Sequence, residues 1–100
     1  MTAYEFLRDN GWCQGAYARD AFGMGVNLQS QQARSFCAMG ALIAAYNDKK
    51  MVHSDAVLLA EQNVYNVLER RGYCGAISSF NDDNGRTKDE VLELFKEAGV

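Results

Sequence analysis

Residues 36–46 (FCAMGALIAAY) contain no charged side chain and no amide side chain, and this stretch constrains the fold most. At helical spacing its large side chains share one side: Phe36, Met39, Leu42, Ile43 and Tyr46. Small residues share the other side: Ala33, Cys37, Gly40, Ala41, Ala44 and Ala45. A helix that is apolar all round is buried. The sequence therefore predicts a central helix over residues 30–46, capped by Ser30, with its small side against another stretch of backbone.

Three further helices are indicated by their start and stop signals. Thr2–Glu5 and Thr87–Glu90 are capping boxes, in which the hydroxyl and the carboxylate each satisfy a backbone amide. Ser54 opens a third helix. Glycines at positions 11, 72 and 99 are expected to end these helices, because glycine takes the left-handed cap conformation without steric cost. The side chains expected to face inward are Ala3, Phe6, Leu7, Val57, Ala60, Val64, Val67, Leu68, Val91, Leu92, Leu94, Phe95 and Ala98.

The segment 15–27 predicts a β-hairpin, because its glycines make a long helix improbable. Its strands are expected near 15–19 and 24–27, joined by a turn at 20–23. Residues 75–80 are compatible with a further strand or with one helical turn, and loops are expected at 48–50 and 81–86. The predicted fold is thus α+β: about four helices around the central helix (30–46), with a small antiparallel β element (15–27, with 75–80 as a candidate addition). Residues 1–100 are expected to form a single compact domain.

Composition narrows the classes of function. The chain is 48% hydrophobic and 23% charged, as in ordinary globular proteins, and its net charge is -3. An acidic chain without a concentrated set of Lys and Arg is not expected to bind nucleic acid. No apolar run reaches the roughly 20 residues that cross a bilayer, so no membrane association is expected. Three cysteines without a Cys-x-x-Cys pair indicate reduced thiols and a cytoplasmic protein.

Three sequence blocks carry a resemblance to a known family. They are residues 11–16 (GWCQGA) followed by 18–20 (ARD), residues 36–42 (FCAMGAL), and residues 80–82 (FND) followed by 85–87 (GRT) and Val91. Together they resemble an uncharacterised domain-of-unknown-function family of small proteins from bacteria, actinobacteria especially, and their phages. The chain departs from relatives in having Asp20-Ala21-Phe22-Gly23 without a following proline, and in having Phe80 where relatives often have Trp. The resemblance implies a bacterial or phage setting and no particular chemistry.

Polar residues near the ends of the expected strands form the candidate ligand site. These residues are Trp12, Gln14, Arg19, Asp20, Asn81, Asp82, Arg86 and Thr87. Two arginines, together with the exposed amides of a helix that begins at Thr87, could hold a small anionic, nucleotide-like ligand. The alternative is architectural: ion pairs between Arg and Asp, with Asn and Asp forming turns. A second candidate surface is an aromatic patch around the hairpin, because Trp and Tyr are frequent at protein interfaces. Its members are Tyr4, Trp12, Tyr17, Phe22 and Tyr73.

Cysteine chemistry and metal binding are less well supported. Cys13 on a glycine-flanked segment could act as a nucleophile only with His53, the single histidine, as its base. Cys37 is expected to be a small core residue. One histidine and three unclustered cysteines give no zinc spacing. A calcium loop with Gly85 in sixth place would put the apolar Phe80 and Val91 at ligand positions, so neither metal nor cofactor is expected.

These observations favour a non-enzymatic binding protein. The leading hypothesis is a small phage or mobile-element accessory factor, with anti-defence as one instance, that binds a host protein or sequesters a small anionic ligand in the bacterial host cytoplasm. The alternatives are a thiol-dependent enzyme that uses Cys13 and a purely structural subunit, for which a homo-oligomer is expected.

Overall fold

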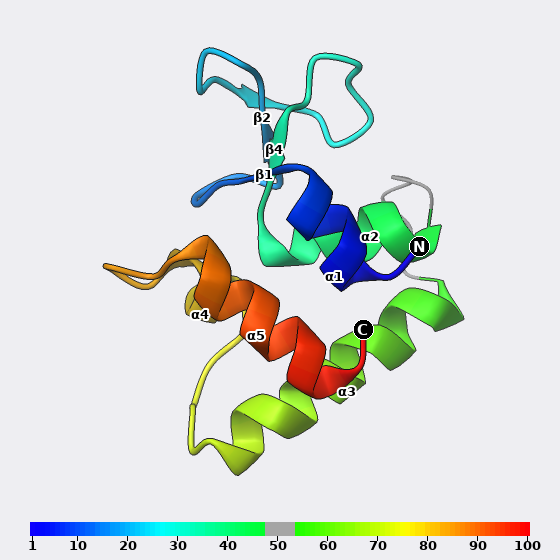
Figure 1. Cartoon of the computed structure of the whole chain (residues 1–100), viewed down its shortest axis with the longest axis vertical. Coiled ribbons are helices and arrows are strands. Elements are labelled where there is room, and N and C mark those ends of the chain that lie inside the picture. The colour runs from blue at the N-terminus through cyan, green and yellow to red at the C-terminus, as the bar shows by residue number, and fades with distance from the viewer. Residues whose placement is uncertain (48–53) are drawn as a thin grey trace.

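In the computed structural model, the described residues, 1–47 and 54–100, form five α-helices and one four-stranded sheet (Figure 1). The helices are α1 (Ala3–Asp9), α2 (Ala38–Asn47), α3 (Asp55–Arg70), α4 (Ile77–Asp82) and α5 (Lys88–Ala98). The strands are β1 (Gly11–Trp12), β2 (Ala18–Arg19), β3 (Gly25–Val26) and β4 (Ser35–Phe36). The predicted α+β class is therefore confirmed. The loop expected at 48–50 lies outside the described residues, as does His53.

The helices form a body from which the sheet projects (Figure 1). Helix α2 packs against α1, α3 and α4, while α5 packs against α3 and α1. The larger core cluster lies among the helices and includes Leu7, Leu42 and Phe95. A second cluster lies under the sheet and includes Leu28 and Phe36. Within the described ranges, no helix combines the length and the apolar character that crossing a membrane requires.

The central helix is buried as predicted, but it begins later than expected. Helix α2 starts at Ala38 rather than at Ser30, because Ser35 and Phe36 form β4 and residues 27–33 form turns. Phe36 pairs with Trp12 on one side and with Ala18 on the other, so strand pairing outweighs the helical pattern here. The predicted close approach is confirmed at Gly40, where any Cβ atom would overlap the carbonyl oxygen of Tyr17.

The sheet has the strand order β1-β4-β2-β3, with β1 and β4 parallel and the other pairs antiparallel. The predicted hairpin is confirmed in β2 and β3, where Ala18 pairs with Val26 and Arg19 with Gly25. Gly23 in the connecting turn has φ +83°, a conformation that glycine adopts without strain. The parallel β1–β4 pair was not predicted, and it makes the sheet mixed rather than antiparallel.

The start and stop signals predicted for the three other helices are confirmed with one exception. Both capping boxes are formed, and Ser54 caps α3. The five apolar residues of the predicted α3 stripe are all buried: Val57, Ala60, Val64, Val67 and Leu68. Gly11 does not cap α1 in a left-handed conformation. It lies in β1, where a Cβ atom would come within 3.0 Å of the Arg34 carbonyl oxygen, so glycine permits the close approach of two strands.

Of the strand and the helical turn expected for residues 75–80, the structure shows the helical alternative, and residues 81–82 belong to that helix rather than to a loop. Helix α4 covers Ile77–Asp82 and buries Ile77, Phe80 and Asn81. Their spacing places these three side chains on one face of a helix, which is the face that packs against the body. The correction is important for the site, because it puts Asn81 inside the protein.

Candidate functional site

Asn81 is the polar centre of the molecule. Its side chain is fully buried, and among the described residues it is the one polar residue in that class. Its Oδ1 atom accepts hydrogen bonds from Trp12 Nε1 (2.7 Å) and from the amide of Ala38 (2.9 Å). Its Nδ2 atom donates to the Cys13 carbonyl oxygen (3.1 Å) and to Asp82 Oδ1 (2.9 Å). One side chain of α4 thereby joins the end of β1 to the first turn of α2.

The loop after β1 is fastened to α4 by further hydrogen bonds. Gln14 Nε2 donates to the carbonyl oxygens of Asn81 and Asp83, both at 3.0 Å. The amide of Gly15 donates to Asp82 Oδ1 at 3.0 Å. Four of the predicted site residues, Trp12, Gln14, Asn81 and Asp82, therefore lie together.

Arg86 and Arg19 both belong to this network. Arg86 donates to the Phe80 carbonyl oxygen (2.8 Å), to Asp83 Oδ2 (2.9 Å) and to Glu90 Oε2 (3.2 Å). Its guanidinium carbon lies 3.7 Å from the centre of the Phe80 ring, a cation–π contact. Arg19 donates twice to the Gln14 carbonyl oxygen, at 3.1 and 3.0 Å. An anion that approached either guanidinium would compete with these internal bonds.

Thr87 and Asp20 have separate local roles. Thr87 caps α5, where its hydroxyl accepts a hydrogen bond from the Glu90 amide (3.3 Å). The Glu90 carboxylate accepts a hydrogen bond from the Thr87 amide in return (2.9 Å), so the predicted anion-binding end of this helix is already occupied by a carboxylate. Asp20 organises the hairpin turn, as described below.

A shallow pocket of about 300 Å³ lies between the loop after β1, the start of α2 and α4. Its lining residues are Gly15, Ala16, Tyr17, Cys37, Met39, Ser78 and Asp82. Of these described residues, Asp82 is the one that carries a charge, and that charge is negative. The pocket therefore suits a neutral or cationic group better than an anionic one.

Cys13 and Cys37 are both buried and flank this region. Burial raises the pKa of the Cys37 thiol to about 11, although its sulfur accepts a hydrogen bond from the Gly40 amide (3.3 Å). Burial also raises the pKa of Cys13, and the Ser35 hydroxyl and the Arg19 guanidinium oppose that rise. A nucleophilic cysteine needs a lowered pKa, so these values do not favour the thiol-enzyme alternative. The base that this alternative requires, His53, lies outside the described residues.

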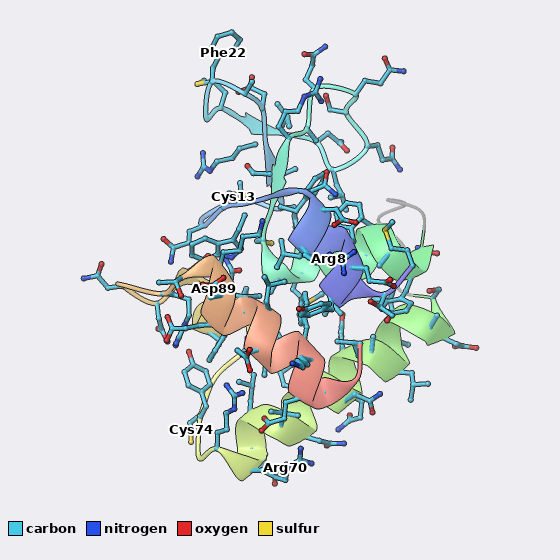
Figure 2. The ribbon with its side chains drawn as sticks, viewed as in Figure 1. Arg8, Cys13, Phe22, Arg70, Cys74 and Asp89 are labelled. Atoms are coloured by element: carbon cyan, nitrogen blue, oxygen red, sulfur yellow. The ribbon has the colours of Figure 1, made fainter. Side chains whose placement is uncertain are left out.

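The lobe, defined as residues 20–34, extends from the sheet at the end of the molecule that is farthest from α3 (Figure 1). Phe22 stands at its tip and points away from the body (Figure 2), with 91% of its surface exposed. The turn beneath Phe22 is held firmly. Asp20 Oδ1 accepts hydrogen bonds from the amides of Phe22 and Met24, both at 2.9 Å, and Arg19 Nη1 donates to the Gly23 carbonyl oxygen at 2.9 Å.

The aromatic patch predicted from the sequence is only partly formed. Phe22 and Tyr17 are exposed, but Trp12 and Tyr73 pack against the helical core. Met24, which is 65% exposed and follows Phe22 by two residues, is the member that sequence reasoning missed. The signal was available: residues 21–33 contain no Asp, Glu, Lys, Arg or His, which is unusual for a surface segment.

Comparison with known proteins gives one match. The model of a family of unknown function (DUF6197) matches residues 2–99. No curated protein and no solved structure matches the chain.

Proposed function

The chain belongs to the family of unknown function DUF6197, and on that premise we propose that it is a binding protein that contacts a partner protein through the lobe, residues 20–34. The observation that carries the proposal is the exposed Phe22 side chain on a turn fixed by hydrogen bonds. Exposing an apolar ring of this size gives the isolated protein no stability.

The turn prepares Phe22 for binding. Three hydrogen bonds to the Asp20 side chain and the Gly23 carbonyl oxygen hold this turn. Two backbone hydrogen bonds add to them: the Asp20 amide donates to the Met24 carbonyl oxygen (2.9 Å), and the Gly23 amide donates to the Asp20 carbonyl oxygen (3.1 Å). A loop that is already ordered loses little conformational entropy when a partner binds. Phe22 therefore has the character of an anchor, a large apolar group carried on a backbone that hydrogen bonds fix before contact.

The rest of the lobe has the composition of an interface. Around Phe22 and Met24, four of its exposed side chains are uncharged amides, Asn27, Gln29, Gln31 and Gln32, and the exposed Arg34 lies where the lobe rejoins the sheet. The centres of protein interfaces are depleted in charge and enriched in aromatic residues and Met, with a polar rim. We infer that the partner offers an apolar socket with hydrogen-bonding groups around it, rather than a charged surface.

The hydrogen bonds of the two site arginines favour a protein partner over the small anionic ligand. Arg19 and Arg86 are engaged with carbonyl oxygens and carboxylates of the chain itself. The ligand hypothesis has its own test in a thermal-shift screen with nucleotides and phosphorylated metabolites. Stabilisation that is lost in both Arg19→Ala and Arg86→Ala would favour the ligand over the protein partner.

The setting that we propose comes from the sequence resemblance. We place the protein in the cytoplasm of a bacterial cell, as an accessory factor of a phage or mobile element, with a host protein as its partner. Anti-defence activity would be one form of such a role. A homo-oligomer is a further outcome that the experiment below can detect.

The experiment is site-specific photo-crosslinking in bacterial cells. A photoreactive benzoylphenylalanine replaces Phe22 in one variant and Leu59, which is 65% exposed on α3, in a control variant. We expect a discrete cross-linked product at position 22 and none at position 59. The partner, identified by mass spectrometry, should then bind Phe22→Ala at least about 30-fold more weakly, since an anchor residue contributes about 2 kcal/mol or more.

Two results would contradict the proposal. Equal cross-linking from positions 22 and 59 would show that the lobe is not a preferred contact surface. An unchanged affinity of the Phe22→Ala variant for the identified partner would show that Phe22 is not an anchor. A cross-linked product with twice the mass of the chain would make a second copy the partner.

A further inference from the structure

Strand register places two of the three cysteines next to each other. In the parallel β1–β4 pair, Gly11 faces Ser35 and Trp12 faces Phe36. The Cys13 amide donates to the Phe36 carbonyl oxygen (3.1 Å), so the pairing continues one residue beyond the strands. The next facing residues are therefore Cys13 and Cys37.

Neighbouring strands lie about 4.8 Å apart, and facing residues of a parallel pair project from the same side of the sheet. Disulfides join residues whose Cα atoms lie about 4.4–6.8 Å apart. The register thus puts Cys13 and Cys37 within bridging range. The two thiols also interact electrostatically: burial is the largest cause of the raised pKa of Cys37 and Cys13 raises it further, whereas the hydrogen bond from the Gly40 amide lowers it.

We propose that Cys13 and Cys37 are a dithiol pair that closes to a reversible intramolecular disulfide when a hydroperoxide reaches it. The bond would tie the end of β1 to the residue before α2, at the base of the sheet. Cys74 is exposed in the segment between α3 and α4, at the opposite end of the molecule from the lobe, and takes no part (Figure 2).

The reaction balances with hydrogen peroxide as the oxidant. The Cys13 thiolate, which the Ser35 hydroxyl and the Arg19 guanidinium favour, attacks one peroxide oxygen. The O–O bond breaks, the leaving hydroxide takes a proton to become water, and Cys13 becomes a sulfenic acid. The Cys37 thiolate then attacks the Cys13 sulfur, the S–S bond forms, and a second water leaves. The protein loses two hydrogen atoms and one peroxide becomes two waters.

In the reduced protein each of the two sulfur atoms makes its own hydrogen bond. The Cys13 sulfur now donates to the Ala16 carbonyl oxygen (3.6 Å), and the Cys37 sulfur accepts from the Gly40 amide (3.3 Å). These contacts hold the thiols in the reduced arrangement. Burial lowers the thiolate fraction at neutral pH, so the pair is expected to react slowly there and faster as the pH rises.

The test is a peptide map of the whole chain after treatment with hydrogen peroxide and alkylation of the remaining thiols in denaturant. Trypsin cleaves after Arg8, Arg19, Arg34, Lys49, Arg71 and Arg86, so each cysteine lies on its own peptide. We expect an intact mass lower by two hydrogen atoms before alkylation, and a linked pair of peptides 9–19 and 35–49. Only Cys74 should be alkylated, and a phosphine reductant should restore the free thiols.

Variants and pH complete the test. Cys74→Ser should leave the yield of linked peptides unchanged, whereas Cys13→Ser and Cys37→Ser should abolish it. The rate should rise about tenfold per pH unit between pH 7 and 8, because the thiolate fraction does so below the pKa. Sulfinic acid on Cys13 and Cys37 without a link, or a link that includes Cys74, would overturn the proposal. If Cys13→Ser or Cys37→Ser does not fold, the peptide maps of the wild-type protein and of Cys74→Ser decide by themselves whether Cys13 and Cys37 are linked.

Discussion

Substitution of Asn81 by Ala should be among the most damaging single changes in this chain. It leaves the Ala38 amide and the Cys13 carbonyl oxygen without their partner, and both residues are buried. A buried polar group left unpaired costs about 1–3 kcal/mol, so two such groups together with the lost packing should cost about 3–5 kcal/mol. A domain of this size has only about 5–15 kcal/mol of stability in total, and the midpoint of thermal unfolding should fall by more than about 12 °C.

Urea denaturation measures this loss with two probes. Trp12, the single tryptophan, donates its Nε1 hydrogen to Asn81 and therefore reports the site by fluorescence. Far-ultraviolet circular dichroism reports the helices, and agreement between the two probes licenses a two-state analysis. The control is Asn66→Ala, because Asn66 is exposed on α3 and should change stability by less than about 0.5 kcal/mol. A loss below about 1 kcal/mol for Asn81→Ala would refute the account of Asn81 as the polar centre.

Asn81→Asp separates hydrogen bonding from packing. The new carboxylate could still accept from Trp12 and Ala38, but it would lose the donor to the Cys13 carbonyl and face the Asp82 carboxylate. Burial and that neighbour should raise its folded-state pKa above the unfolded value. The penalty relative to wild type should therefore be largest at neutral pH and should shrink as the pH falls through the raised pKa. A penalty that is constant from pH 7 to pH 5 would contradict this reasoning.

Three further outcomes are expected. The Gly40→Ala variant should lose about 2–4 kcal/mol of unfolding free energy, measured by urea denaturation, because its Cβ atom would overlap the Tyr17 carbonyl oxygen. The unfolding free energy of the control variant Gly25→Ala should change little, because the nearest neighbour of its Cβ atom would lie at 3.8 Å. The Thr87 backbone hydrogen bond lowers the pKa of Glu90, so Glu90→Gln should be less stable than wild type near pH 7, with the difference lost as the pH falls through that lowered pKa. Binding through the lobe, whose residues 21–33 carry no charge, should change in affinity by less than about twofold between roughly 0.05 and 0.5 M salt, as measured by titration calorimetry.

The parts of the fold that follow from local chemistry were predictable. The capping boxes at Thr2 and Thr87, the apolar stripe of α3 and the hairpin turn each depend on residues close in sequence. The close approach at Gly40 was predictable too, because the small side of the helix needed a backbone partner. The start of α2 was not, since Ser35 and Phe36 are drawn into the sheet by β1 and β2, far earlier in the chain.

The candidate site was predicted as a set of residues but not as an arrangement. Trp12, Gln14, Asn81 and Asp82 do lie together, yet the sequence placed Asn81 in a loop. Helix α4 has six residues, and Ala76 at its start gives no side-chain cap, so the helix carries no start signal. The burial of Asn81 depends on tertiary contacts with the segment after β1, and sequence reasoning has no access to those.

The lobe, which includes the edge strand β3, begins and ends at adjacent positions of the sheet. It starts after Arg19 at the end of β2 and returns at Arg34, whose amide donates to the Arg19 carbonyl oxygen at 2.8 Å. A chain segment with such closely spaced ends can be exchanged for another of different length without moving the scaffold, provided that the new segment still pairs with β2 and that apolar side chains still fill the places of Leu28 and Ala33. On the proposed function, the same scaffold would present different recognition loops, and selection would change the partner while the helices stay as they are.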